Sequence, residues 1–427
     1  MKANTILFLF LLAISSYGFA QPDFKEYFEN EGSLRVDYNL SGQYNEQQIF
    51  LYQIRKESFY AGSQKNLIDP FVYGSYYFEV YDKAEGKLIF SRGFNTLFEE
   101  WQTTDESKTE RKAFKESLCF PLPKEKVVLK ILKSRAPDHP AVLYETEIDP
   151  SNPLITQTDT GKYKVFEYMI NGKPRKKVDI LFIAEGYTLD EMSDFKDDVR
   201  KFSDYMFNQE PFEKNKNKFN IRAVCSYSDE SGTDIPGKGI WKSTVVNSNF
   251  FTFGSERYLT TSDYWAVRDI AARAPYDQIV VLVNSKKYGG GGIYNHYSLF
   301  SANHSLSKLV FIHEFGHGFA GLGDEYYTSS VAYSEFYPLD KEPLAPNLTT
   351  LVDFESKWKD MVSQSTPIPT PASSEFENTV GLFEGGGYSA KGIYRPYIDC
   401  RMKSNKAKGF CPVCQRAIQR MIDFYTK

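Results

Sequence analysis

Residues 307–326 read SKLVFIHEFGHGFAGLGDEY, and this stretch decides how the second half of the chain is interpreted. Its first part is apolar and long enough for a helix. His313 and His317 are four positions apart and face the same way on a helix, so both imidazoles can reach one metal ion. Glu314 is turned away by one position, which sets its carboxylate beside a metal-bound water. The spacing therefore predicts a zinc site with Glu314 as general base.

Glycines are frequent around the two histidines. Gly316 and Gly318 fall inside the predicted helix, where each costs about 1 kcal/mol relative to alanine, so we expect a close approach there. Gly321 can end the helix in a left-handed conformation, after which the chain can carry Asp324 back toward the imidazoles. The alternative, that the histidines are ordinary core or solvated side chains of a helix, leaves these glycines unexplained.

The pattern His313-Glu-x-x-His317-x-x-x-Gly321-x-x-Asp324 resembles the extended zinc signature of metzincin-type metallopeptidases, with aspartate in the place of the third ligand. It is most similar to the M64 family, the bacterial IgA-peptidase-like proteins, whose motif continues into Asp-Glu-Tyr as residues 324–326 do here. The resemblance covers essentially the whole chain after residue 20. It implies Zn²⁺ bound by His313, His317 and Asp324, catalysis by Glu314, and a protein or peptide substrate.

The sequence departs from the general metzincin spacing at one point. Gly321 and Asp324 each lie one residue further from His317, although their mutual separation is kept. Glu325 is therefore a second candidate for the third ligand, with a supporting role as the other interpretation. Tyr394, Arg395 and Tyr397 are candidates for stabilising the oxyanion, and the sequence does not choose among them.

The resemblance also suggests roles for two further segments. Residues 289–296 begin with four glycines, and in metzincin-like folds a strand at this place borders the cleft and pairs with the substrate backbone. The alternative is a flexible loop. Met402, in residues 400–404, resembles the methionine of the turn beneath the metal, the alternative being a buried structural methionine.

Two hydropathy patterns predict two domains. Residues 21–150 alternate apolar and polar positions in short runs, which predicts an all-β, sandwich-like domain. Residues 99–115 are charged and are interpreted as a solvated helix or a long loop, and residues 151–176 as a linker. Residues 177–427 alternate strands and helices, which predicts an α/β (α+β) domain with a mixed sheet. The resemblance makes this a metzincin-like zinc peptidase domain. The strand runs expected in the first domain are 34–40, 49–54, 76–80, 88–90, 127–132 and 142–148.

The first twenty residues have the features of a cleavable signal peptide. Lys2 is followed by the apolar run 6–14 and by small residues at 18–20. The run is too short to span a membrane, which takes about 20 apolar residues, so no transmembrane anchor is expected. The next residue is Gln21 and not cysteine, so no lipid anchor is indicated. We therefore expect a secreted or periplasmic protein.

Five cysteines fit an exported protein. Cys119 and Cys225 stand alone, whereas Cys400, Cys411 and Cys414 are close in sequence. A disulfide among these three is favoured over a metal knuckle, because a structural zinc ion usually has four ligands. The sequence does not settle the pairing.

The leading functional hypothesis is an exported zinc-dependent endopeptidase. The alternative is a catalytically inactive or non-peptidase surface or periplasmic binding protein on a peptidase scaffold, and zinc-dependent hydrolysis of a non-peptide bond is a third. The intact Glu314 and histidine pair favour an enzyme. A net charge of -4 gives no general attraction for nucleic acid. The β domain could bind protein or glycan, or simply cover the peptidase domain. Natural substrate, cleavage specificity and oligomeric state stay open.

Overall fold

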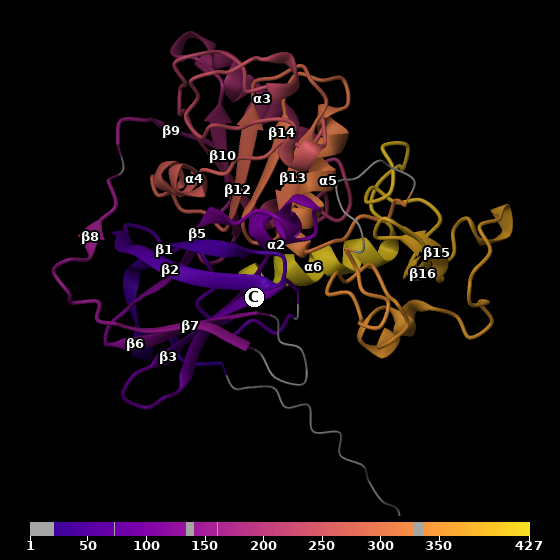
Figure 1. Cartoon of the computed structure of the whole chain (residues 1–427), viewed down its shortest axis with the longest axis horizontal. Coiled ribbons are helices and arrows are strands. Elements are labelled where there is room, and N and C mark those ends of the chain that lie inside the picture. The colour runs from indigo at the N-terminus through magenta and orange to yellow at the C-terminus, as the bar shows by residue number, and fades with distance from the viewer. Residues whose placement is uncertain (1–20, 72, 134–140, 160, 328–335) are drawn as a thin grey trace, which may run out of the picture.

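The computed structural model describes residues 21–71, 73–133, 141–159, 161–327 and 336–427. The predicted signal peptide, residues 1–20, lies outside the described residues. The chain forms two domains (Figure 1): an N-terminal β domain, coloured indigo to purple, and a C-terminal domain built around a larger sheet. Among the described helices, none combines the length and apolar character needed to cross a bilayer.

The N-terminal domain consists of two four-stranded sheets that enclose one apolar core. The predicted alternation is present, and each predicted run lies within a strand. In β1, for example, Leu34, Val36, Tyr38 and Leu40 are all buried in that core. The strands, in spatial order, are β5 (Lys112–Pro123), β1 (Phe28–Gln43), β2 (Glu46–Glu57) and β8 (Thr156–Gln157) in one sheet, and β4 (Leu88–Phe94), β3 (Tyr76–Asp82), β6 (Val127–Lys133) and β7 (Ala141–Ile148) in the other.

The charged segment 99–115 differs from its expectation. It contains the end of α2 (Leu97–Gln102) and the beginning of β5, which pairs antiparallel with β1. β5 is an edge strand of its sheet, and its first residues are exposed or half-buried, so their charged side chains stay in solvent. A short helix α1 (Phe24–Tyr27) precedes β1. The charged start of β5 hid a strand whose second half alternates, with Leu118, Phe120 and Leu122 packed in the core.

The C-terminal domain is built on a six-stranded mixed sheet. The four strands β11, β10, β12 and β14 are parallel, and the two edge strands β9 and β13 run antiparallel to their neighbours. Every residue of β10 is buried, as is usual for a parallel strand with both faces covered. In spatial order the strands are β13 (Gly290–Ile293), β14 (Tyr297–Ser301), β12 (Gln278–Val283), β10 (Val178–Glu185), β11 (Phe219–Val224) and β9 (Val165–Ile170).

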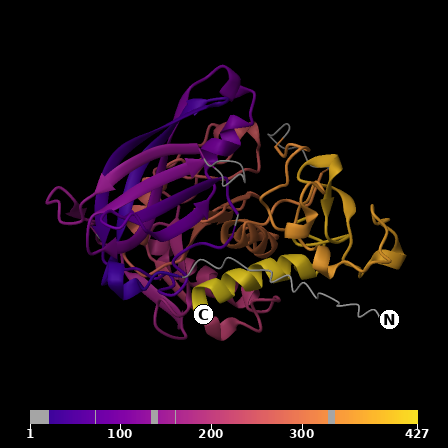
Figure 2. The same cartoon turned by 90° about the horizontal axis from the view of Figure 1, so that it is seen from below.

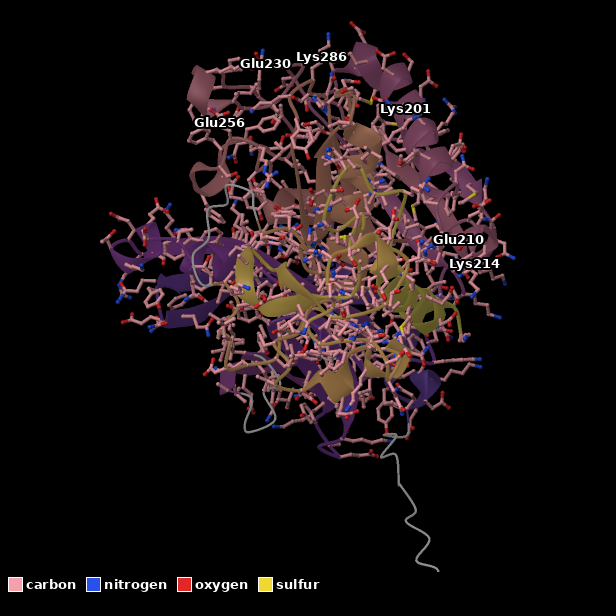
Figure 3. All side chains as sticks on the ribbon, turned by 90° about the vertical axis from the view of Figure 1, so that its right-hand side faces the viewer. Lys201, Glu210, Lys214, Glu230, Glu256 and Lys286 are labelled. Atoms are coloured by element: carbon pink, nitrogen blue, oxygen red, sulfur yellow. The ribbon has the colours of Figure 1, made fainter. Side chains whose placement is uncertain are left out.

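Helices cover both faces of this sheet. Ile180 and Phe182 of β10 point into a core shared with α3 (Met192–Met206), α5 (Ser307–Ala320) and α6 (Pro412–Thr426), whereas Leu181 and Ile183 face α4 (Tyr264–Ala271). The opposite side of α3 faces solvent, where Lys201 lies among charged side chains labelled on the outside of the molecule (Figure 3). The buried apolar side chains of α3, among them Phe195, Val199 and Phe202, belong to this core.

Residues 151–176, interpreted as a linker, include β9 and so contribute a strand to the sheet of the C-terminal domain. The Pro-rich segment 340–375 and the hairpin β15 (Phe383–Gly386) and β16 (Ser389–Arg395) form the gold extension beside α6 (Figure 2). Trp358 anchors this extension, since its side chain is fully buried and its indole N–H donates to Gly381 O at 3.0 Å.

Buried polar contacts join the two domains. Arg35 on β1 is fully buried and pairs with Asp37 at 2.7 Å and with Asp269 of α4 at 2.6 Å. Trp265 of α4 stacks on Tyr52 of β2 with ring centroids 4.4 Å apart. A buried guanidinium needs such carboxylate partners, so the interface has a defined geometry.

The glycine run at residues 289–292 lies against α5, and its lack of side chains permits the contact. A Cβ on Gly292 would lie 2.3 Å from Glu314 O, and one on Gly290 would lie 2.8 Å from Glu314 Oε1. These residues form the edge strand β13 and not the flexible loop that was the alternative. The strand therefore sets the distance between the sheet edge and the histidine helix.

We expect Gly292→Ala to destabilise the protein, because the added Cβ meets backbone that cannot move without shifting α5. Overpacking of this kind costs about 1–3 kcal/mol in the free energy of unfolding. Gly409→Ala is the control, since its Cβ would meet its nearest neighbour at an ordinary 3.9 Å. Denaturant unfolding measures both, and equal stabilities would contradict the proposed close packing.

Candidate metal centre

Helix α5 ends where the sequence predicted. Gly321 adopts a left-handed conformation, with φ of 61°, and its N–H donates to His317 O at 3.0 Å. The chain then reverses, so that Asp324 reaches the face of α5 that carries both histidines. The structure thus brings together the three residues that the sequence assigned to the metal.

Three ligand atoms converge at this place. His313 Nε2 lies 3.1 Å from His317 Nε2, and Asp324 Oδ1 lies 3.0 and 3.3 Å from these two nitrogens. The histidines are partly exposed, whereas Asp324 is buried. Their side chains are close enough for all three to bind one ion.

Backbone carbonyls orient both imidazoles. His313 Nδ1 lies 3.0 Å from Arg401 O, and His317 Nδ1 contacts Leu322 O. A carbonyl can only accept, so each Nδ1 carries a proton, and in its neutral, metal-binding form each imidazole presents the lone pair of Nε2. These two lone pairs and one from Asp324 Oδ1 then face the same point, where a cation would compensate all three.

The spacing of these atoms suits zinc. Ligands about 2.0–2.2 Å from a tetrahedral ion lie roughly 3.4 Å from one another, close to the separations found here. Asp324 Oδ1 is buried without a hydrogen-bond partner, as an atom reserved for a cation would be. These three residues therefore fit a zinc ion, and their binding of zinc stays a prediction.

Asp324 is held by a second contact that the sequence did not indicate. Tyr388, between β15 and β16, donates its hydroxyl to Asp324 Oδ2 at 2.6 Å and leaves Oδ1 facing the imidazoles. Burial opposes ionisation of Asp324, but His317 and His313 hold the pKa of its carboxyl well below the ordinary value. The same carboxylate outweighs the effect of burial on His317 and raises its pKa to about 9.

Glu314 lies beside the three ligand atoms and is not one of them. Its carboxylate packs near Gly290 on the sheet edge, in the same cleft as the histidines. Burial raises the pKa of Glu314, while the charges of His313 and His317 act in the opposite direction. A carboxylate in such surroundings is suited to take up and release a proton.

A large cleft contains the candidate centre, with a volume of about 1220 Å³. Both domains line it: Glu100 and Lys133 come from the N-terminal domain, and Arg257 from the C-terminal domain. The expected pairing of substrate along β13 is restricted at one end, because Leu259 N–H already donates to Gly290 O.

The three oxyanion candidates are not in this cleft. Arg395 is buried and donates to Glu384 O and Gly385 O, so its guanidinium is fixed within the hairpin, and Tyr394 and Tyr397 do not line the cleft either. Arg257 does line the cleft, with its guanidinium 5.5 Å from the ring centre of Tyr326. It follows a turn without a recognisable motif, so only the tertiary fold identifies it.

Met402 lies beneath the histidine helix, as its resemblance to a Met-containing turn suggested. It is fully buried, and a Cβ on Gly316 would lie 2.9 Å from its sulfur. Gly318 makes a similar close approach, to Ser298 Oγ. The two helix glycines are therefore explained by packing against a turn and a strand.

Glu325, the second candidate for the third ligand, and two further histidines lie elsewhere. Glu325 points away from the histidines into the core, so it does not reach the centre as an alternative third ligand. His296 pairs with Glu116 at 2.9 Å at the domain interface. His304 accepts a bond from Leu306 N before α5 begins.

Comparison with known proteins identifies related sequences. A family model described as IgA peptidase M64 matches residues 167–379 and 372–422. A second, described as the peptidase M64 N-terminus, matches residues 23–143. No curated protein matches the chain.

We expect Tyr388→Phe to weaken zinc binding about 10–100-fold, because it removes the hydroxyl that orients Asp324. Competition with a chromogenic chelator measures the affinity. Tyr394→Phe, from the same hairpin but outside the cleft, is the control and should bind like wild type. Equal affinities for the two variants would show that the bond to Asp324 Oδ2 does not support a ligand.

Proposed function

The chain belongs to the IgA peptidase M64 family, and on this premise we propose that it is a zinc-dependent endopeptidase with a metzincin-like catalytic domain. Membership implies a peptidase hydrolase. One observation carries the finer proposal: the Nε2 atoms of His313 and His317 and Oδ1 of Asp324 converge beside Glu314 in a large cleft. The order of β13, the histidine helix and the methionine turn supports the metzincin-like interpretation.

His313, His317 and Asp324 would hold the ion. Zinc in such a site lowers the pKa of its bound water toward about 7 and polarises a substrate carbonyl. Glu314 accepts the proton released when water attacks the peptide carbonyl, and then donates it to the amine that leaves. Burial raises the pKa of Glu314, which favours its holding the proton until the amine leaves.

Arg257 is the best-placed cation for the charge that develops on the carbonyl oxygen. It lines the cleft, and its charge acts on the neighbouring Tyr326, Asp324 and Glu314. A preorganised donor at a developing oxyanion contributes a large part of catalysis in acyl transfer. We assign this role to Arg257, in place of the candidates on the hairpin.

The N-terminal domain is proposed to take part in substrate binding. Glu100 and Lys133 line the cleft from that domain, so a bound polypeptide would contact both domains. A protein or peptide is therefore the substrate class that this cleft fits. Export to the periplasm or the exterior is proposed from residues 1–20 of the sequence.

Glu314→Gln is expected to keep zinc and to hydrolyse a peptide library at least about a hundredfold more slowly, because the amide cannot accept the proton. Glu342→Gln, in the same cleft but away from the histidines, is the control. Full activity of the Glu314 variant would exclude it as the base. A zinc-loaded wild type that cleaves no peptide would instead favour the alternative of an inactive binding protein.

Arg257→Met is expected to lower kcat about 10²–10³-fold, because the negative charge that develops on the carbonyl oxygen loses its cationic partner. The zinc content should stay that of wild type, because Arg257 is not a metal ligand. Steady-state kinetics with zinc analysis measures both. A rise in KM alone would assign Arg257 to substrate binding.

A further inference from the structure

A second cluster of metal-ligand side chains lies in the core below the candidate centre. Glu325 follows α5, Cys400 begins the methionine turn, and Cys411 and Cys414 lie at the start of α6. All four residues are buried, and one ligand atom from each falls within 4.8 Å of the others. This set is called the cysteine–glutamate cluster.

The separations within the cluster are those of a tetrahedral zinc site. Cys400 Sγ lies 3.7 Å from Cys414 Sγ, and Cys414 Sγ lies 3.3 Å from Glu325 Oε1. Zinc–sulfur bonds of about 2.3 Å place two sulfur ligands about 3.8 Å apart. The backbone N–H of Cys411 donates to Cys400 Sγ at 3.2 Å, which favours a charged sulfur.

Glu325 independently indicates a cation. Its side chain is fully buried, and Oε1 accepts from Asn347 at 2.9 Å while Oε2 has no hydrogen-bond partner. Within the described part of the chain, no lysine, arginine or histidine forms an ion pair with it. Arg395 acts on Glu325 only from beyond ion-pair distance, and a buried carboxylate without a direct partner costs several kcal/mol. An ion between Glu325 and the sulfurs would account for its position.

A disulfide explains the cluster less completely. The described cysteines are all free thiols, which differs from the disulfide expected from the sequence. A disulfide would use two of the three clustered sulfurs and would leave the third, with Glu325, uncompensated. From the sequence, a metal was disfavoured because only three cysteine ligands were recognised. The fold brings Glu325, from a distant segment, to the place of a fourth ligand.

We propose that Glu325, Cys400, Cys411 and Cys414 bind a structural zinc ion, separate from the candidate catalytic centre. All four positions are occupied by protein, as in closed structural sites. The inference does not depend on peptidase activity, because none of these residues lines the cleft.

Such an ion would fix the surroundings of the catalytic ligands. Asp324 and Glu325 are consecutive residues. Asp324 faces the candidate catalytic centre, and Glu325 faces the cysteine–glutamate cluster. Glu325 N–H donates to Met402 O at 2.9 Å, and Arg401, next to Cys400, supplies the carbonyl for His313 Nδ1. The structural ion would therefore position the turn that orients a catalytic histidine.

The test uses the full chain in which substitutions have removed the two histidines of the candidate catalytic centre. His313→Ala/His317→Ala protein, prepared with zinc, is expected to retain about one equivalent by elemental analysis. X-ray absorption at the zinc edge should show sulfur neighbours at about 2.3 Å. This measurement needs no cysteine variant and reads no activity, so it is independent of the proposed function.

Substitutions then assign the ion. Adding Glu325→Gln to that double variant should weaken zinc retention at least about tenfold in chelator competition, since the amide is a poorer ligand. Cys225→Ser is the control, because Cys225 is buried in the same core but outside the cluster, and it should retain zinc like the parent. A disulfide found by mass spectrometry without sulfur-bound zinc would overturn the proposal. Free thiols that take up no zinc would overturn it as well.

Discussion

The reversal of the chain at Gly321 is the constraint on which both ligand sets depend. Its left-handed conformation ends α5 at Ala320, about one turn after His317, and turns the next residues back along the helix. Leu322 O then meets the Nδ1 of His317, Asp324 meets both Nε2 atoms, and Glu325 enters the core. A residue with a side chain would be strained at this φ. Relief of that strain would shift the backbone and disturb every one of these contacts.

The methionine turn is the second support of the site. Cys400, Arg401 and Met402 are consecutive, and each serves a different neighbour: the cysteine–glutamate cluster, the Nδ1 of His313 and the underside of α5. Gly316 lets Met402 approach the helix. The site is thus held from below by one turn, whose own position depends on the start of α6.

The sequence predicted the parts of the fold that carry a strong local pattern. The alternating strands of the N-terminal domain and the turn at Gly321 were both expected from residue spacing. β5 was missed because its first residues are charged, and β9 because it lies in a segment that was interpreted as a linker. Arg257 and Tyr388 were missed because they reach the site only through tertiary folding. For the same reason Glu325 could not be joined to the cysteines, since 75 residues separate it from Cys400. Spacing identifies ligands that share a helix, whereas ligands from separate segments need the fold.

The interface between the domains bears on the cleft as well as on stability. Helix α6 begins at the cysteine–glutamate cluster and ends against the N-terminal domain, where Asn66 donates to Phe424 O at 2.7 Å and Arg92 lies over the Phe424 ring (Figure 2). Arg35 joins the same two domains through Asp269 on the other side of the sheet. The cleft walls from Glu100 and Lys133 are therefore held relative to α5 by contacts on both sheet faces. A site divided between domains fixed in this way can select substrate without a large closure, because its two walls are already in place.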